Sequence, residues 1–244
     1  TLAKQKNVKI YPPKFRYSKG EYTPNKEDNS IYKGIGSIKY CNNTIGEEMY
    51  QLRGKKYNDF VDVLVDLTEN TSCNSRQLSI LIKLDFFSEF GGGKYLLDIY
   101  DYFAKRYKKT HIQKTKDARI SEIKEYIGGL ENVNLTIKEV VEAQVEFIGY
   151  IDYIDPSFND DIMLVVSLKK TTYNTFATLY RLSDGMDADV KINKGFYKNN
   201  PLKECDVIKV IDIEHKHKMK KVDGKFITLE EKEYVLSSYS MVQI

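Results

Sequence analysis

The stretch that most constrains the fold is residues 31–53, where an apolar strip enters a turn and leaves as an amphipathic helix. Gly34 and Gly36 lie two residues apart in this strip, and small polar residues follow before the helix begins. Because glycine has no Cβ, these positions allow the backbone to approach another group closely. The helix that follows offers free N–H groups at its first turn, which is where anions bind. The segment therefore predicts a turn whose backbone could hold a phosphate.

The charge of the chain is uneven although its total is small. The net charge of the 244 residues is +3, yet residues 1–60 and 94–120 each hold an excess of lysine and arginine. Clustered cations indicate a polyanionic partner, although a solvated lysine face looks the same. Part of the second block, from Lys105 to Lys109, falls at the end of an expected helix, where cations also suit the helix dipole.

The composition is that of a folded soluble chain. Hydrophobic residues make up 41% and charged residues 30%, which is typical of globular rather than disordered proteins. No apolar run is long enough to span a membrane and no signal peptide is visible, so we expect a cytoplasmic protein without a membrane partner. Cys41, Cys73 and Cys205 are widely spaced, which predicts reduced packing residues rather than disulfides.

The first half of the chain has helical periodicity. Residues 1–30 are expected to be a mostly irregular lead-in with one short strand at 8–11. Apolar residues then recur at helical spacing, with Asn58 as a candidate N-cap for the second helix and Asn74 or Ser75 for the third. A helical linker over 111–140 follows, with a turn at Gly128 and Gly129. The expected helices cover residues 41–53, 58–69, 76–84, 94–108, about 120–127 and 135–143.

The second half has the spacing of β-strands. From Val145 the apolar residues alternate with a period of two, and a glycine interrupts the first expected strand. Several short strands within about 100 residues indicate a small barrel or sandwich, and a long first strand with a glycine favours an oligonucleotide-binding (OB) barrel. We therefore predict an α+β chain with more than one domain, with an all-α domain over 31–110 and a barrel over 141–244. The expected strands cover 145–154, 162–169, 175–182, 189–194, 207–215 and 233–242, with a hairpin at 222–225.

No catalytic centre is predicted. The sequence holds three histidines, His111, His215 and His217, and neither phosphate-loop nor dinucleotide-binding glycine patterns. The aspartates at 160–161 and 184–189 lie in turn-like stretches, where aspartate serves turn formation. We expect no catalytic residue, no metal ligand and no cofactor within this segment.

What remains is a set of residues suited to nucleic acid. Cations and asparagines around the first turn would hold duplex phosphates without reading bases. These candidates are Lys33, Gly34, Gly36, Lys39, Asn42, Asn43, Arg53, Lys55, Lys56, Arg76 and Lys83. In the β half, cations alternate with aromatic residues, as suits a single strand held by stacking and charge. These candidates are Lys169, Lys170, Tyr173, Phe176, Tyr180 and Arg181; the spacing of Phe176 and Tyr180 fits a core-facing position equally well.

Short motifs in a fixed order then point to one family. They lie at residues 7–13, 32–39, 57–60, 74–87 and 147–150. This succession resembles the C-terminal region of the bacterial DNA polymerase III alpha subunit, a C-family replicative polymerase. In that family a Gly-Ile-x-Val-x-Pro-Pro segment and a Gly-Leu-x-x-Ile-Lys segment lead into tandem helix–hairpin–helix units, and an OB domain follows.

The resemblance implies a DNA-binding part of a replication enzyme. The helix–hairpin–helix region would hold double-stranded DNA and the barrel single-stranded template. The parent protein would be a DNA-directed DNA polymerase, a nucleotidyltransferase using Mg²⁺, with its catalytic carboxylates upstream of this chain. Other replisome subunits are implied partners, but residues 104–140 hold no clamp-binding peptide, so a sliding-clamp contact is not expected.

Two departures from the family pattern affect the hairpins. Tyr40-Cys41-Asn42 stands where the family has Gly-Val-Gly, and Asp85 stands where it has glycine. Asn42 or Asn43 could take the left-handed conformation instead, and Asp85 would repel a phosphate. Two alternatives therefore stay open: a stand-alone, non-catalytic nucleic-acid-binding adaptor, and an interaction module whose barrel binds protein.

Overall fold

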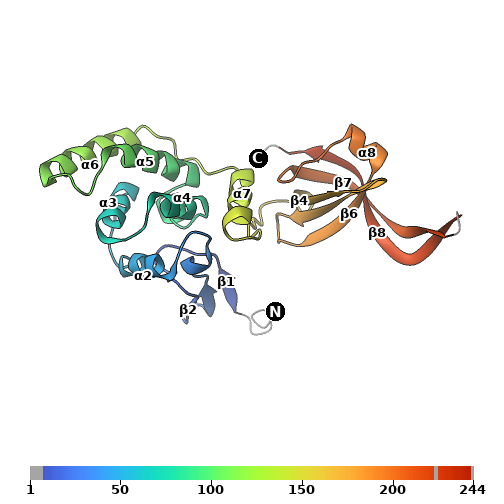
Figure 1. The fold of residues 1–244 in the computed structure, drawn as a ribbon, viewed down its shortest axis with the longest axis horizontal. Helices are drawn as coiled ribbons and strands as arrows, with labels where there is room; N and C mark the ends of the chain where they lie inside the picture. Colours follow the sequence, from blue (N-terminus) through green and yellow to red (C-terminus); the bar gives the residue numbers. More distant parts are fainter. Residues whose placement is uncertain (1–7, 223–224, 243–244) are drawn as a thin grey trace. The chain divides into compact units, whose positions relative to one another are not determined.

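The computed structural model describes residues 8–222 and 225–242 (Figure 1). The chain divides into two units, Thr1–Ile151 and Asp152–Ile244. The first is mainly helical and the second is a β-sheet with one short helix. The expected α+β class is therefore confirmed. The boundary between the helical and the β unit lies at Ile151, later in the chain than the expected boundary near residue 140.

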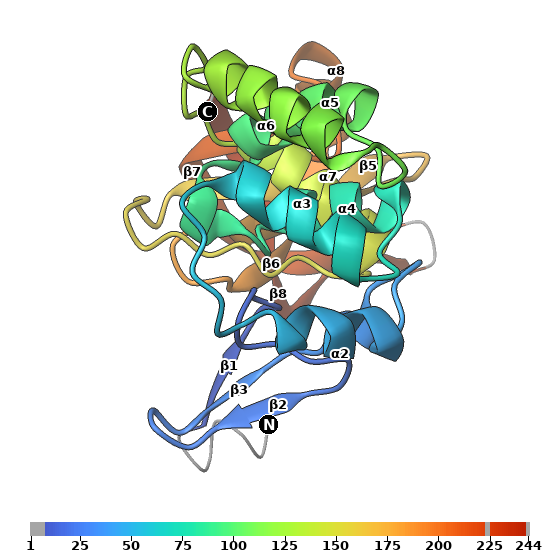
Figure 2. The same cartoon turned by 90° about the vertical axis from the view of Figure 1, so that its left-hand side faces the viewer.

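The helical unit begins with a small three-stranded sheet. β1 (Lys9–Tyr11) pairs in parallel with β3 (Ser30–Tyr32), which pairs with antiparallel β2 (Thr23–Asn25). Figure 2 shows this sheet beside the first helix of the unit. The sequence predicted β1 alone, because two strands of three residues in a polar stretch give no periodic signal.

Six α-helices and two 3₁₀ turns follow within the described part of this unit. The 3₁₀ turns are η1 (Ile35–Ser37) and η2 (Ser88–Phe90). The helices are α2 (Asn43–Gln51), α3 (Phe60–Asn70), α4 (Ser75–Lys83), α5 (Gly93–Arg106), α6 (Gln113–Ile127) and α7 (Ile137–Phe147). All six correspond to expected helices, five of them within two residues at the start, whereas α6 begins about seven residues earlier than expected.

Side-chain caps explain where several of these helices begin. The side chains of Asn42, Asp59 and Asn74 each accept a hydrogen bond from a first-turn N–H, of α2, α3 and α4 respectively. The predicted cap Asn58 is therefore wrong by one residue, since Asp59 takes that role. Buried aromatic residues hold the helices together, with Phe86 and Phe87 in an edge contact 4.8 Å apart and each 1% exposed or less.

The predicted strand over 145–154 is wrong. Residues 145–147 are the last turn of α7, and no strand is assigned between α7 and Ile162. A capping box between Thr136 and Glu139 starts the helix, and Val141 and Phe147 are buried at helical spacing. The run from Val145 to Ile151 resembles alternation because the helix end and the loop after it both contain apolar residues.

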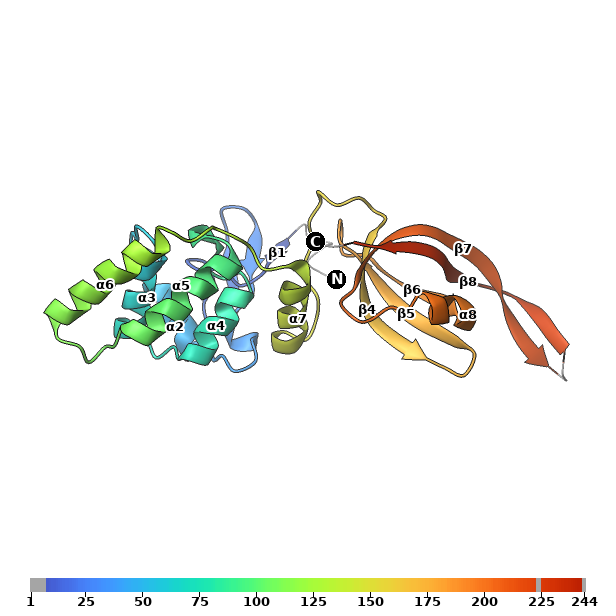
Figure 3. The ribbon, with the colours of Figure 1, turned by 90° about the horizontal axis from the view of Figure 1, so that it is seen from above.

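The second unit is a five-stranded sheet that closes on itself (Figure 3). The strands are β4 (Ile162–Lys170), β5 (Asn174–Arg181), β6 (Asp187–Asn193), β7 (Val207–Val222) and β8 (Lys225–Met241). They pair in the order β4-β5-β6-β8-β7, and β7 pairs back with β4. The β6–β8 pair is parallel and the others are antiparallel.

The connections in this unit differ in part from the sequence prediction. A short helix, α8 (Lys194–Asn199), lies between β6 and β7 and was not expected. β7 and β8 are longer than predicted, and Val222 pairs with Lys225 across the expected hairpin. Asp223 and Gly224, which form the centre of that predicted turn, lie outside the described residues.

Candidate nucleic-acid interface

Gly34 and Gly36 approach the chain itself rather than an open surface. A Cβ on Gly34 would lie 2.3 Å from the carbonyl oxygen of Gly20, and one on Gly36 would lie 2.9 Å from the same oxygen. The N–H groups of Ile35 and Gly36 donate to the carbonyls of Lys19 and Gly20, both at 2.9 Å. The expectation that these two glycines face a phosphate is therefore wrong. They are glycine because the segment 19–21 lies against them.

The turn of the first hairpin is made by Tyr40 rather than by an asparagine. Tyr40 has a φ of 70°, in the left-handed region, at the position where the resembling family has its first glycine. Asn42 is extended and caps α2 through a 3.0 Å hydrogen bond from the N–H of Ile45, and Asn43 is the first helical residue. The expectation that Asn42 or Asn43 takes the left-handed conformation is therefore wrong.

Contacts from α4 hold the Tyr40 turn in place. The guanidinium of Arg76 lies 3.3 Å from the centre of the Tyr40 ring, and the side chain of Gln77 donates to the Tyr40 carbonyl at 2.9 Å. Left-handed backbone costs a residue with a Cβ about 1–2 kcal/mol, while the exposed cation–π contact contributes about 0.5–1 kcal/mol and the Gln77 hydrogen bond about 0.5–1.5 kcal/mol. The hairpin is therefore kept without its usual glycine.

An exposed polar surface surrounds this turn. Lys39, Asn42, Asn43 and Arg76 are all exposed, and the Lys39 ammonium lies 5.2 Å from the Tyr40 ring. The first N–H groups of a helix have no partners within it, and in α2 the Asn42 side chain accepts one of them, that of Ile45. We call Lys39, Tyr40, Asn42, Asn43 and Arg76 the hairpin surface.

Three other predicted cations lie beyond the far end of α2. Arg53 is exposed, covers the Tyr50 ring at 4.1 Å and donates to the Tyr50 carbonyl. The Lys55 ammonium is held by both carboxylate oxygens of Asp66, at 2.8 and 2.9 Å, so its charge is already compensated. Lys56 is exposed. Since α2 has nine residues, about 14 Å separates this group from the hairpin surface.

Lys33 and Lys83 have neighbours that are not part of the hairpin surface. The Lys33 ammonium lies 4.7 Å from the ring of Tyr150. Lys83 ends α4 and lines a small groove together with three glutamates of α7, Glu139, Glu142 and Glu146. Phosphate binding by Lys83 is not favoured, because those carboxylates would repel a phosphate there.

The second hairpin also has a non-glycine residue in the left-handed conformation. Asp85 has a φ of 61°, where the family pattern has glycine. Its carboxylate accepts a 3.2 Å hydrogen bond from Lys14, a residue that also contacts Ser88. The negative charge expected to repel phosphate is therefore partly compensated from within the unit.

In the β unit, one row of side chains crosses three strands. Phe176 on β5 pairs with Lys169 on β4 and with Lys191 on β6, and directly paired residues point to the same face. Phe176 is 38% exposed. Next to this row, hydrogen bonds join Ser167, Thr178 and Asp189 across the same strands.

The loop between β4 and β5 extends this face. Tyr173 at its tip is 79% exposed. Lys170 lies 5.1 Å from the ring of Tyr197, and Lys194 donates to the carbonyl of Thr172 at 3.0 Å. Strand pairing brings Lys191 to this face and the unexpected helix α8 brings Lys194, so the sequence did not reveal either residue. The Lys191 ammonium is held by Glu233 at 2.6 Å, so its charge is already compensated. We call Lys169, Lys170, Tyr173, Phe176, Lys191 and Lys194 the strand face.

Tyr180 and Arg181 do not belong to the strand face. Tyr180 is 9% exposed and its hydroxyl lies beside Gly185, 2.8 Å from where a Cβ on that glycine would be, so its ring is not available for stacking. The core-facing reading is wrong for both rings, because Ala177 and Leu179 on the other face of β5 belong to the barrel core while Phe176 is exposed and Tyr180 is covered on its own face. Arg181 forms a two-bond pair with Asp184, at 2.8 Å for one bond, and this pair lowers the pKa of Asp184 to about 2.

Two further points concern the described residues, a metal cluster and a membrane-spanning helix. No group of three or more His, Cys, Asp or Glu side chains in that part of the chain could hold a metal ion. Nor is any described helix long and apolar enough to cross a membrane.

Comparison with known proteins bears on the helical unit. Residues 7–96 match the family model described as a helix-hairpin-helix motif, while the chain matches no curated protein. The matched range contains the whole hairpin surface and the turn at Asp85. The helical unit therefore carries a helix–hairpin–helix motif, which indicates binding to DNA.

Proposed function

We propose that this helix–hairpin–helix chain is the DNA-binding portion of a replicative DNA polymerase resembling the polymerase III alpha subunit. One observation carries the proposal. Within the matched range, the two non-glycine residues Tyr40 and Asp85 adopt left-handed backbone at the two hairpin positions where that family has glycine. The backbone geometry of both hairpins is thus retained although the glycines are not.

The helical unit would hold duplex DNA through the hairpin surface. Lys39 and Arg76 supply exposed charge, and the first N–H groups of α2 can donate to a phosphate oxygen. Such contacts go to the sugar-phosphate backbone, so binding would depend on salt and little on sequence.

The β unit would act as an OB barrel for single-stranded DNA. Its closed strand order, the parallel pair between its third and fifth strands, and a helix between the third and fourth support that assignment. OB barrels bind oligonucleotides on the face of strands two and three and at the loop between strands one and two. The strand face occupies those positions, with Tyr173 and Phe176 available for stacking.

The parent protein in this proposal is a nucleotidyltransferase that uses Mg²⁺ and works in DNA replication with other replisome subunits. Polymerisation would belong to a catalytic region outside this chain. An upstream reading frame encoding metal-binding carboxylate motifs would support the polymerase. Its absence would favour a stand-alone, non-catalytic module. That alternative is supported by the N–H groups of Ile35 and Gly36, which donate to carbonyls of the chain itself and so are not available to a phosphate.

Charge removal at the hairpin surface tests the duplex contact. Lys39→Ala with Arg76→Ala should weaken binding to a labelled 20-base-pair duplex and reduce the log–log salt slope by about 2, since each phosphate-contacting cation contributes about 0.9. Lys83→Ala is the control for the loss of one charge in the same unit, because Lys83 lies among glutamates, and it should leave the salt slope unchanged. Equal affinity for the double variant and the control would remove the hairpin surface from the DNA path.

Removal of the two exposed rings tests the single-strand contact. Tyr173→Ala with Phe176→Ala should weaken oligo-dT binding at least tenfold, since each stacked base contributes about 1–3 kcal/mol. Tyr22→Ala, which removes a 60% exposed ring from the helical unit, is the control. An unchanged affinity for oligo-dT would mean that the barrel does not bind a single strand through this face.

A further inference from the structure

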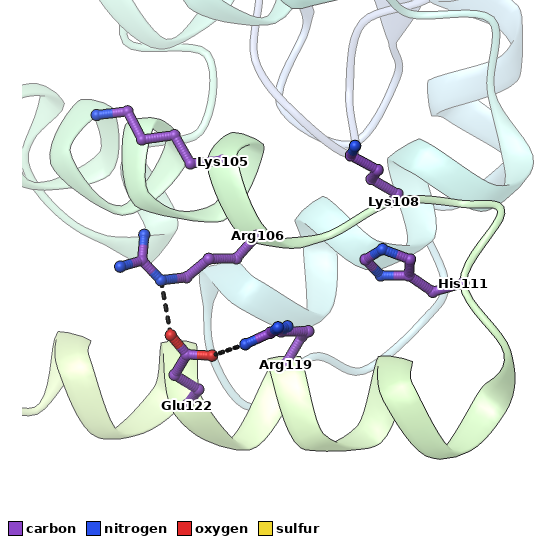
Figure 4. Close-up of a pocket in the computed structure, with 6 residues that line it drawn as sticks. All are labelled: Lys105, Arg106, Lys108, His111, Arg119 and Glu122. Atoms are coloured by element: carbon purple, nitrogen blue, oxygen red, sulfur yellow. Dashed lines mark hydrogen bonds and ion pairs between the residues drawn. The ribbon is translucent and has the colours of Figure 1, made fainter.

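A basic hollow lies between α5 and α6, away from the residues assigned above (Figure 4). It has a volume of about 510 Å³ and is lined by Lys105, Arg106, Lys108, His111, Arg119 and Glu122. Four cationic side chains thus surround one carboxylate. The end of α5 and the second turn of α6 supply most of them, and His111 comes from the turn that joins the two helices.

The single carboxylate arranges two of the cations. Glu122 accepts a hydrogen bond from the Nε of Arg106 and another from an Nη of Arg119, both at 2.7 Å. Hydrogen bonds from Arg119 and Arg106 lower the pKa of Glu122. A guanidinium has five N–H donors, so each arginine keeps donors for a further acceptor. Arg106 is also held against Tyr102, 3.4 Å from its ring centre.

One polar atom in the hollow is left without a partner. The Nδ1 of His111 is shielded from solvent and has no hydrogen-bond partner among the described residues. Figure 4 shows the imidazole extending from the 107–112 turn toward the other lining side chains. A buried polar nitrogen without a partner is costly, so a turn of the imidazole that brings this nitrogen to an acceptor in the hollow would be favourable.

The helix dipole does not account for this charge. The end of α5 carries a partial charge of roughly −0.5, which one cation would offset. The hollow has four cations against Glu122, so a surplus of positive charge remains. Among the described residues, neither Lys105 nor Lys108 has an ion-pair partner, whereas nearby Lys116 is paired with Glu69 at 2.9 Å.

We propose that this hollow binds a phosphate group of a nucleic-acid backbone, as a second phosphate contact of the helical unit apart from the hairpin surface. Arg106 and Arg119 would supply directed N–H donors, Lys105 and Lys108 would supply charge, and His111 would fill its open hydrogen bond. Arginine forks suit phosphate oxygens, and lysines add point charges. The nucleic-acid source rests on the proposed function, whereas the phosphate chemistry rests on the hollow alone.

Charge removal and a histidine resonance test the site in the full chain. In the double variant Lys105→Ala/Lys108→Ala, the loss of duplex affinity between 50 and 200 mM salt should become about threefold smaller, as expected when one phosphate contact is lost. Lys26→Ala with Lys138→Ala is the control, with the same charge change at two exposed lysines of the same unit. The His111 ring-nitrogen resonance, assigned with His111→Gln, should shift with duplex DNA and with millimolar inorganic phosphate, but not with chloride at equal ionic strength.

The outcomes separate the site from the proposed function. One outcome rejects the site alone: the chain binds duplex, the double variant matches its control, and the His111 resonance shifts with neither probe. In that case the hollow is not a phosphate site, and the proposed function stands. A shift with inorganic phosphate but not with duplex would overturn the nucleic-acid source and leave a site for a free phosphate. A chain that binds no DNA would contradict the proposed function, and the inorganic phosphate titration would still decide whether the hollow binds phosphate.

Discussion

Gly46→Ala should destabilise the helical unit, although helix propensity alone predicts the reverse. Gly46 lies inside α2, where alanine is favoured over glycine by about 1 kcal/mol. A Cβ at this position would lie 2.4 Å from the Gly20 nitrogen, 2.5 Å from the Gly20 Cα and 2.7 Å from the Lys19 carbonyl carbon. All three are backbone atoms, so no side-chain rotation can relieve the overlap.

The segment that Gly46 contacts cannot move away freely. Its carbonyls accept the N–H groups of Ile35 and Gly36, both at 2.9 Å, and a shift would break these bonds. Overpacking costs about 1–3 kcal/mol, and we take the upper value because rigid backbone is involved. Subtracting the helix gain leaves a net loss of about 2 kcal/mol. For a unit of this size the loss corresponds to a fall in Tm of about 4–8 °C.

Thermal unfolding followed by far-ultraviolet circular dichroism at the helix band measures this effect, because the helices lie almost entirely in this unit. Gly54→Ala is the control in the same unit, since a Cβ at Gly54 would meet no neighbouring atom within 4 Å. The control should keep the Tm or raise it slightly, because a tolerated change from glycine to alanine increases the free energy of unfolding by up to about 1 kcal/mol. A Gly46→Ala variant that unfolds at or above the temperature of Gly54→Ala would refute the packing argument.

Three further predictions concern charge, pH and thiols. Asp85→Gly removes a negative charge and a left-handed non-glycine residue from the second hairpin, so duplex affinity measured by anisotropy should rise. Burial opposes ionisation of Asp66, but hydrogen bonds, first from Lys55, lower its pKa below the ordinary value. The ionised carboxylate therefore stabilises the fold above about pH 4, and this stabilisation is lost as the pH falls through the lowered pKa. The Tm difference between wild type and Asp66→Asn should therefore shrink below about pH 4. Burial raises the pKa of Cys41 to about 11 and of Cys73 to about 12, so iodoacetamide at pH 8 should modify both far more slowly in the folded chain than in urea.

Each of these predictions has a result that contradicts it. Unchanged or weaker duplex binding by Asp85→Gly would show that the second hairpin does not face DNA. A Tm difference for Asp66→Asn that stays constant from pH 7 to pH 2 would mean that the carboxylate is not ionised preferentially in the fold. Rapid alkylation of Cys41 or Cys73 in the native chain would contradict the raised pKa of these half-buried thiols.

The helices were predictable because their signals are local. Asn74 and the apolar spacing after it define α4, and Phe60 with its neighbours does the same for α3. The end of α7 was not predictable, because Val145 and Phe147 fit a strand as well as a helix. The capping box that starts α7 at Thr136 decides the matter once the helix is followed to its full length.

The candidate site was predictable in outline but not in its contacts. The cations near the first turn were found, yet the partner that engages Lys55 is 11 residues away in sequence and gives no local signal. The role of Gly34 and Gly36 was misjudged because the segment they contact, near Gly20, precedes them across two strands. Lys191 joins the strand face through the register of β5 and β6, which periodicity does not supply.

The most direct test of this account is the binding of the full chain to labelled duplex, single-stranded and primer–template DNA, measured by fluorescence anisotropy at 50 and 200 mM salt. Two nucleic-acid surfaces on one chain predict binding to all three probes, the tightest to primer–template, with affinity that falls steeply as salt rises. Binding that does not change with salt, or no binding to any probe, would contradict the account.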